Sequence, residues 1–187
     1  MSKAVLISIR PEWCRKIASG RKTMELRKSK PKLPTPFKCY IYLTKQKKHE
    51  DTWLAAVETQ RCLYYGAGSI IGEFVCDHIL GQCQMQNADL AEQQSLVKRE
   101  RIFEYANGRE VFGWHISELK IYDTPKKLSE FTPCCEFLDG DECPNYLRVG
   151  CPYQQIDYNQ DASVNVVLCG RRLTRAPQSW CYVEELT

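Results

Sequence analysis

The alternation of apolar and polar residues predicts a series of short strands with few helices between them. Residues 4–9 form a nearly continuous apolar run, typical of a strand covered on both faces. Residues 39–44 alternate as in a half-buried strand, and 69–76 form a weaker one in which Gly72 marks a bulge or a close backbone approach. Residues 180–183 predict a final short strand.

Helix start and stop signals occur twice. Pro11 fits the first turn of a helix that Gly20 ends, with Trp13, Cys14, Ile17 and Ala18 on one side of it. A second helix is predicted as one continuous element over 89–107, from an acidic start to an Asn-Gly stop.

Two further segments predict strands. In residues 23–27, Met24 and Leu26 face a core, while Thr23, Glu25 and Arg27 share the opposite face. Residues 112–122 predict one long strand with an irregularity near position 118, where the alternation slips. At least six short strands with two helices indicate an α+β fold, a mixed β-sheet or β-barrel with flanking helices.

The length of 187 residues suits one domain, and the 43% hydrophobic and 26% charged content disfavours disorder and a membrane-embedded fold. We therefore expect a single domain over 1–187. Residues 132–172 are rich in Cys, Asp, Asn and Gly and show little periodicity, so we expect them to form a cysteine-rich insertion.

The modest net charge of +3 averages two unlike regions. Residues 1–50 hold 14 Lys and Arg against 3 Glu, a net +11, and the remainder holds 12 basic and 20 acidic residues, a net −8. The strongly cationic N-terminal quarter of the chain favours an anionic partner if its charges share one face of the protein. The alternative is that these lysines and arginines form a solvated surface that only keeps the protein in solution. Apolar runs are too short for a signal peptide or for the roughly 18 residues of a membrane span, so we expect a cytoplasmic protein. The sequence leaves the oligomeric state open, with a monomer expected.

The run from Gly20 to Arg27 carries the most specific motif. Gly20, Lys22, Glu25 and Arg27 have the spacing G-x-K-x-x-E-x-R, placed between a predicted helix and a predicted strand. This run resembles the defining motif of the ASCH domain, in the PUA-like superfamily. Resemblance extends to residues 8–13, 69–72, 113–116 and 177–182, and by order of elements to 3–131 and 173–185. It implies a small PUA-like β-barrel whose motif-lined cleft binds RNA, a nucleoside or a modified base.

The residues of the motif also indicate a polar cleft on chemical grounds. One carboxylate among cations stays ionised, and the cations then suit an anionic or carbonyl-bearing ligand. The alternative is that Glu25 and Arg27 form only a structural ion pair. The candidate ligand-binding residues are Arg10, Trp13, Gly20, Arg21, Lys22, Thr23, Glu25 and Arg27.

Some members of the family resemble amidohydrolases that remove an acyl group from N4-acylated cytidine. In those, the lysine that matches Lys22 activates a threonine where this sequence has Glu25. A carboxylate does not replace that nucleophile, so here Glu25 would act as a general base on water while Lys22 stabilises the oxyanion. We therefore carry three hypotheses: a binding domain for RNA or a modified nucleoside, an amidohydrolase, and a non-catalytic interaction module.

Aromatic residues would supply base stacking, although most are expected in the core. The candidates are Trp13, Tyr40, Tyr42, Trp114 and Trp180. His115 is expected to be a hydrogen-bonded structural histidine, and His49 and His78 belong to no recognisable constellation.

Eleven cysteines in a reducing compartment favour buried thiols or metal ligands over disulfides. The insertion allows a structural zinc held by Cys134 or its neighbour Cys135, with Cys143, Cys151 and Cys169. Free thiols are the alternative, because the sequence contains no C-x-x-C spacing there. No other cofactor is required.

Overall fold

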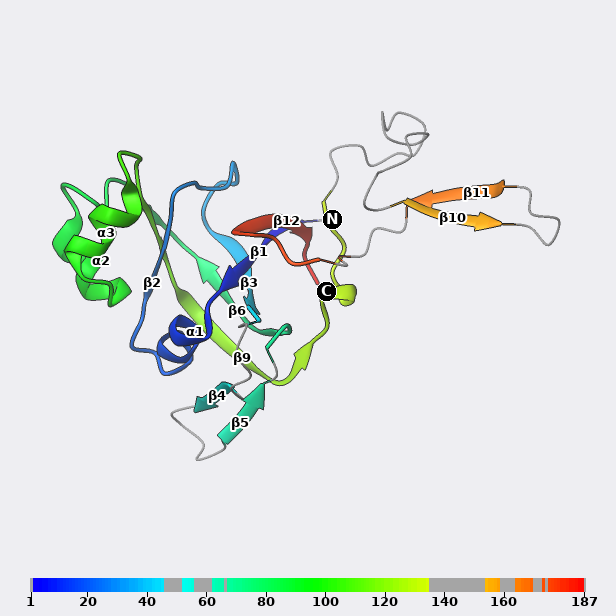
Figure 1. Cartoon of the computed structure of the whole chain (residues 1–187), viewed down its shortest axis with the longest axis horizontal. Helices are drawn as coiled ribbons and strands as arrows, with labels where there is room; N and C mark the ends of the chain where they lie inside the picture. The colour runs from blue at the N-terminus through cyan, green and yellow to red at the C-terminus, as the bar shows by residue number, and fades with distance from the viewer. Residues whose placement is uncertain are drawn as a thin grey trace.

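A computed structural model describes residues 2–45, 67–134, 173 and 175–186, with the backbone of four more strands at 52–55, 62–65, 154–158 and 164–169 (Figure 1). The helices are α1 (Pro11–Ala18), α2 (Ala88–Ser95) and α3 (Arg99–Ala106), with a 3-10 turn η1 (Leu128–Glu130). The strands are β1 (Lys3–Ile9), β2 (Met24–Arg27), β3 (Phe37–Leu43), β4 (Thr52–Ala55), β5 (Cys62–Tyr65), β6 (Ile70–Cys76), β7 (Ile79–Leu80), β8 (Phe112–His115), β9 (Ser117–Lys126), β10 (Gln154–Tyr158), β11 (Val164–Cys169) and β12 (Trp180–Glu184).

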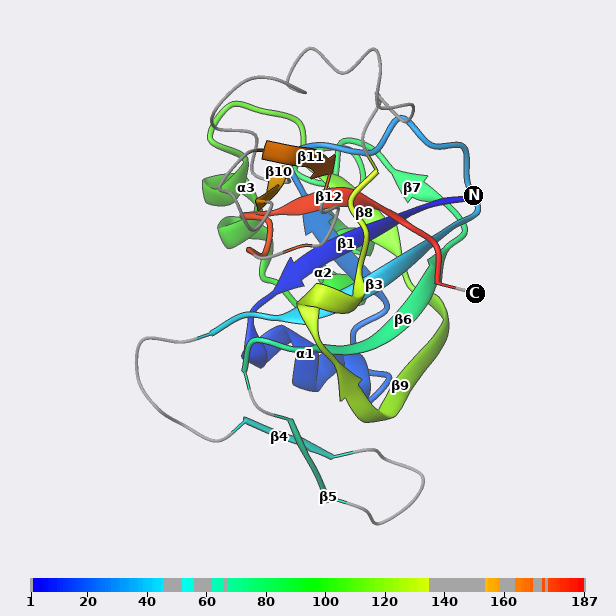
Figure 2. The ribbon, with the colours of Figure 1, turned by 90° about the vertical axis from the view of Figure 1, so that its right-hand side faces the viewer.

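The larger sheet has five strands in the order β12-β1-β3-β6-β9. Strands β1 and β3 are parallel, and the other neighbours are antiparallel. Strand β1 is buried on both faces, as its apolar run predicted. Val5 and Ile7 pack into one core cluster with residues of α1, while Ala4 and Leu6 pack into a second cluster on the other side of the sheet. Figure 2 shows the chain ends on neighbouring strands, because the C-terminal β12 pairs with the N-terminal β1.

The smaller sheet has three strands in the order β2-β8-β7, so β2 is an edge strand. Met24 and Leu26 of β2 pack on Ala91, Ile102 and Val111 in a third core cluster, which joins this sheet to α2 and α3. This packing confirms the predicted inward face of residues 23–27. The opposite face of β2 carries Glu25 and is directed toward the larger sheet.

The structure is α+β, as predicted, but the described strands do not close into a barrel. They form separate sheets of five, three, two and two strands with open edges. Pairs β4-β5 and β10-β11 are the two-stranded sheets. Most of the cysteine-rich insertion lies outside the described residues. In the part of the chain that the structure describes, no helix has the length and apolar content to cross a membrane.

The prediction of one continuous helix over 89–107 was wrong. Leu96 ends α2 with a left-handed backbone at φ +58°, and α3 begins anew at Arg99. A leucine carries no sequence signal for that conformation, which usually favours glycine or asparagine.

The single strand predicted over 112–122 is two strands in different sheets, β8 and β9. Glu118 near the change has φ +47°, so the predicted irregularity exists. At Gly72, the predicted close approach is confirmed, because a Cβ there would meet the carbonyl oxygen of Lys120 and lie 3.1 Å from the Cα of Ile121.

We expect Gly72→Ala to lower the free energy of unfolding by about 3 kcal/mol, because the methyl group would press on the backbone of β9. Urea unfolding followed by circular dichroism measures the change. Gly81→Ala is the matched control. Its Cβ would meet the carboxylate end of the flexible Glu110 side chain, which accepts from the Gln82 N–H at 3.2 Å, and we expect a change of no more than about 1 kcal/mol. Equal losses in both variants would contradict the assigned approach of β6 to β9.

Candidate functional site

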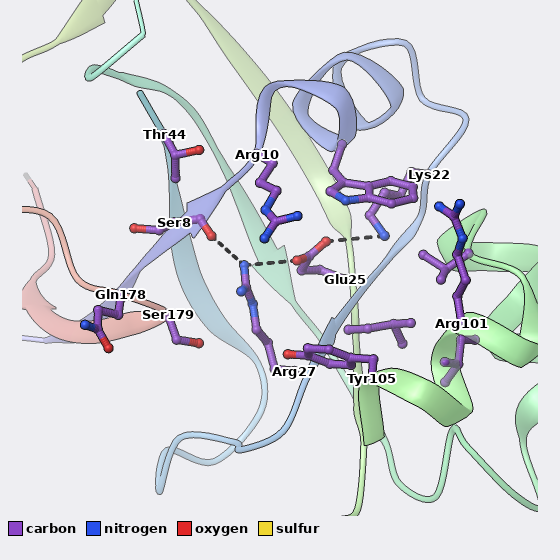
Figure 3. Close-up of a pocket in the computed structure, with 14 residues that line it drawn as sticks. Ser8, Arg10, Lys22, Glu25, Arg27, Thr44, Arg101, Tyr105, Gln178 and Ser179 are labelled. Carbon is purple, nitrogen blue, oxygen red and sulfur yellow. Dashed lines mark hydrogen bonds and ion pairs between the residues drawn. The ribbon is translucent and has the colours of Figure 1, made fainter. Parts of the chain in front are cut away.

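A cavity of about 530 Å³ lies along the edge strand β2 (Figure 3). Its walls come from the end of β1 and the start of α1, from β2, from α3, and from the segment before β12. The lining residues are Ser8, Arg10, Trp13, Lys22, Glu25, Leu26, Arg27, Thr44, Val97, Arg101, Ile102, Tyr105, Gln178 and Ser179. Because β2 is an edge strand, residues on both of its faces reach this cavity.

A sharp turn after α1 brings Lys22 to the cavity. Gly20 has φ +70°, a conformation that glycine adopts without a steric penalty. Its N–H donates to the carbonyl of Ile17 at 2.8 Å, and the N–H of Lys22 donates to the carbonyl of Lys16 at 2.9 Å. The turn is thereby held against the last turn of the helix, and the chain enters β2 directly after it.

Three charged side chains of the motif form a buried network. Glu25 lies between two cations, with Oε2 at 3.3 Å from Lys22 Nζ and Oε1 at 3.0 Å from Arg27 Nη2. Lys22 is 2% exposed and Glu25 is 7% exposed. A buried carboxylate needs such partners, because the loss of hydration is otherwise uncompensated.

Lys22 has further partners. Its Nζ donates to the carbonyl oxygen of Ser95 at 2.9 Å and lies 5.0 Å from the centroid of the Trp13 ring. Burial lowers the pKa of Lys22, and the nearby charge of Glu25 opposes this shift. The ammonium group is thus held in place by α2, β2 and α1.

Arg27 connects the network to the larger sheet. Its Nη2 donates to the carbonyl oxygen of Ser8 at 2.7 Å, at the end of β1. Ser8 Oγ in turn donates to the carbonyl of Pro177 at 2.7 Å, which ties down the segment before β12. The Arg27 Nε is buried and has no hydrogen-bond partner among the described residues.

Two other arginines line the cavity and can offer their guanidinium groups to a ligand. Arg10 and Arg101 are exposed, and neither has an ion-pair partner within the described residues. Counted together, the lining holds four cations and one carboxylate, a net charge of +3. Tyr105 of α3 is 41% exposed, and Lys28 Nζ lies 4.7 Å from its ring centroid.

Cys14 of α1 is close enough to the network to be influenced by the charges of Glu25 and Arg27, and its chemistry is that of a buried thiol. Its Sγ donates to the carbonyl of Ile9 at 3.6 Å. Burial, followed by the negative charge of Glu25, raises the pKa of Cys14 well above its ordinary value. A thiol in this state is a poor nucleophile.

The structure brings together five of the eight predicted ligand-binding residues. The residues that line the cavity are Arg10, Trp13, Lys22, Glu25 and Arg27. Gly20, Arg21 and Thr23 do not line it. The backbone of Thr23 instead pairs with Gln94 and Ile116.

Sequence reasoning missed Arg101 and Tyr105, because a polar helix face gives no sign of which cavity it borders. Of the candidate stacking residues, Trp13 alone lines this cavity. Tyr40, Tyr42 and Trp114 are buried in the core, and Trp180 donates its indole N–H to Ser29 Oγ at 3.0 Å.

The predicted zinc ligands cannot be compared with the structure as a set. Cys134 is described and has a free thiol, whereas Cys135, Cys143, Cys151 and the side chain of Cys169 lie outside the described residues. His115 is hydrogen-bonded, as expected, since its Nδ1 lies 2.7 Å from Asp77 Oδ1. The prediction for His78 was wrong, because it lies in the same constellation.

No family model and no curated protein matches this chain. Among solved structures, those similar to this chain include three of an ASCH protein from Zymomonas mobilis. The structure without a named substitution has a TM-score of 0.51 and 18% identity, covering 67% of this chain and 73% of the other.

A Tyr-to-Phe variant has a TM-score of 0.51 and 19% identity, covering 68% of this chain and 77% of its own. A Ser-to-Ala variant has a TM-score of 0.50 and 20% identity, covering 67% and 74%. The chain therefore has an ASCH-type fold.

Replacement of Glu25 by Gln is expected to lower the free energy of unfolding by about 3–5 kcal/mol, because it leaves buried Lys22 and Arg27 without a counter-charge. Thermal and urea unfolding report the loss. In the control Glu12→Gln, the change removes a carboxylate from an exposed ion pair with Lys16, and we expect no more than about 0.5 kcal/mol. Wild-type stability of the Glu25→Gln protein would show that the network is not desolvated.

Proposed function

We propose that this chain is an ASCH-domain protein whose cavity along β2 binds RNA or a modified nucleoside or nucleotide. The observation that carries the proposal is the composition of the cavity wall, four cations and one carboxylate beside two aromatic rings. Cations hold phosphate oxygens, and aromatic faces stack on unpaired bases, as in the recognition of single-stranded RNA. The ASCH-type fold and the motif residues in the wall support the same assignment.

The cations of the cavity have two different roles in this proposal. Lys22 is occupied by Glu25 and Ser95, so its part is to fix the wall. Arg10 and Arg101 remain for the phosphate groups of the ligand, and the unpartnered Nε of Arg27 suits a carbonyl oxygen of a base. Tyr105 offers its exposed ring for stacking.

Binding of a fluorescein-labelled single-stranded RNA tests this assignment. We expect Arg10→Ala and Arg101→Ala each to weaken binding about tenfold, the loss of one charge-assisted hydrogen bond. Each variant should also reduce the slope of log K against log salt concentration by about 0.7. Fluorescence anisotropy at several salt concentrations gives both values.

Arg109→Ala is the control for that experiment, because Arg109 is exposed and does not line the cavity. It should bind RNA as the wild type does. If all three variants lose the same affinity, the basic surface as a whole binds RNA and the cavity has no special part in it. If the wild type does not bind RNA, the non-catalytic interaction module is favoured.

A second candidate function rests on the ammonium and carboxylate that share the cavity wall. In an amidohydrolase acting on N4-acylated cytidine, Glu25 would take a proton from water as the oxygen attacks the acyl carbonyl. Lys22, 3.3 Å from Glu25, would stabilise the oxyanion. The C–N bond would then break, and the proton would pass to the leaving amine, giving cytidine and a carboxylate.

Chromatography of N4-acetylcytidine incubated with the protein measures this activity. If it exists, Lys22→Met should lower turnover by about a hundredfold or more, because the oxyanion loses its cation. The Arg109→Ala protein is the matched control, and the melting temperature of each variant separates loss of chemistry from loss of fold. No turnover by the wild type would remove the hydrolase hypothesis and leave the binding proposal to the RNA experiment.

A further inference from the structure

A second cluster of reactive side chains lies outside the cavity. Asp77 and His78 follow β6, and His115 is the last residue of β8. The N–H of His115 donates to the carbonyl of His78 at 3.1 Å, which fixes the two histidines beside each other. Their rings stack with centroids 4.4 Å apart, and Asp77 Oδ1 lies 2.7 Å from His115 Nδ1 and 3.0 Å from His78 Nδ1.

This cluster is separate from the cavity. In the β2–β8 ladder, Met24 pairs with His115 and Glu25 pairs with Trp114. Neighbouring residues of a strand project to opposite faces, so His115 is on the face of the smaller sheet opposite Glu25. None of the three residues of the cluster lines the cavity. A function of the cluster is therefore independent of the one proposed above.

The three side chains each bring one potential ligand atom into the same cluster. Two imidazole nitrogens and one carboxylate oxygen all lie within 4.8 Å of one another. Bonds to zinc from such atoms measure about 2.0–2.2 Å, so one ion between them would contact all three after small rotations of the side chains. The side chains of Asp77 and His78 are 43% and 56% exposed, which leaves room for such rotations.

The donor set also selects the kind of ion. Imidazole nitrogen suits zinc and other first-row transition metals, whereas magnesium and calcium prefer oxygen alone. Asp77 adds one carboxylate oxygen to the two imidazole nitrogens, and this mixed nitrogen and oxygen donor set is one that zinc binds.

We propose that Asp77 Oδ1, His78 Nδ1 and His115 Nδ1 form a binding site for one divalent transition-metal ion, such as zinc. Three protein ligands leave at least one coordination position to water or to another ligand, as in open zinc sites. In the absence of an ion, Asp77 Oδ1 accepts hydrogen bonds from the Nδ1–H groups of the two imidazoles. On metal binding each ring changes to the tautomer with its proton on Nε2, or loses the Nδ1 proton to solvent, and the Nδ1 lone pair then binds the ion.

Nuclear magnetic resonance of the full chain labelled with ¹⁵N-histidine tests the site, because the sequence holds only three histidines. On stepwise addition of zinc sulfate, the Nδ1 resonances of His78 and His115 should shift together and saturate with one ion. His49, outside the described residues, is the internal comparison. Zinc taken up by cysteine thiols does not produce this paired imidazole signature.

Asp77→Asn is the variant that separates a metal site from a hydrogen-bonded pair of histidines. The amide keeps the size of the side chain and its capacity to accept a hydrogen bond, but removes the anionic ligand. We expect zinc affinity at the two imidazoles to fall by at least about tenfold.

Circular dichroism should report an unchanged fold for Asp77→Asn. If the fold of that variant is altered, His78→Ala replaces it in the zinc titration. Zinc at about 1 mM would half-load even a site with a millimolar Kd. Absence of a paired shift in the wild type at that concentration would overturn the proposal. Unchanged zinc affinity in Asp77→Asn would also overturn it.

Discussion

Glu25 is a carboxylate held inside the protein between two cations, and the arrangement of the site depends on this contact. Each of the three charges loses hydration on burial, and only their mutual pairing and added hydrogen bonds offset that cost. The two partners of Glu25 are hydrogen-bonded to different parts of the fold. Lys22 reaches the end of α2 through Ser95, and Arg27 reaches the end of β1 through Ser8. One ion triad therefore connects the larger sheet, the edge strand and the helical layer.

The triad also divides the cationic lining into an inner and an outer group. Inside, Lys22 and Arg27 share the single carboxylate of Glu25, which leaves a net charge of +1, and several elements fix their positions at once. Outside, Arg10 and Arg101 come from different elements of the cavity wall, one after β1 and the other in α3. A rigid interior with available charges around it is an arrangement suited to binding an anion, because few groups lose freedom when the ligand arrives.

Much of this site follows from local sequence patterns. The alternation in residues 23–27 predicts which side chains of β2 face the core, and the motif identifies Lys22, Glu25 and Arg27, all of which line the cavity. Arg101 and Tyr105 were not predictable, because their position depends on how α3 packs on the sheet. The same holds for His78 and His115, which backbone pairing between distant segments brings together. A periodic pattern indicates which face is inside, but not which other element it meets.

The interruption between α2 and α3 has an energetic consequence for the buried ammonium group. In an uninterrupted helix the carbonyl of Ser95 would accept the N–H of residue 99. Here the N–H of Arg99 donates to Glu92 Oε2 at 3.3 Å instead, and the Ser95 carbonyl is left for Lys22. The two hydrogen bonds, from the Arg99 N–H to Glu92 and from Lys22 to the Ser95 carbonyl, both replace the backbone bond that a continuous helix would form. A sequence that continued the helix through Leu96 would gain local helical order, but the Ser95 carbonyl would then be shared between Lys22 and a backbone N–H, so greater helix propensity there would weaken the hold on an interior charge.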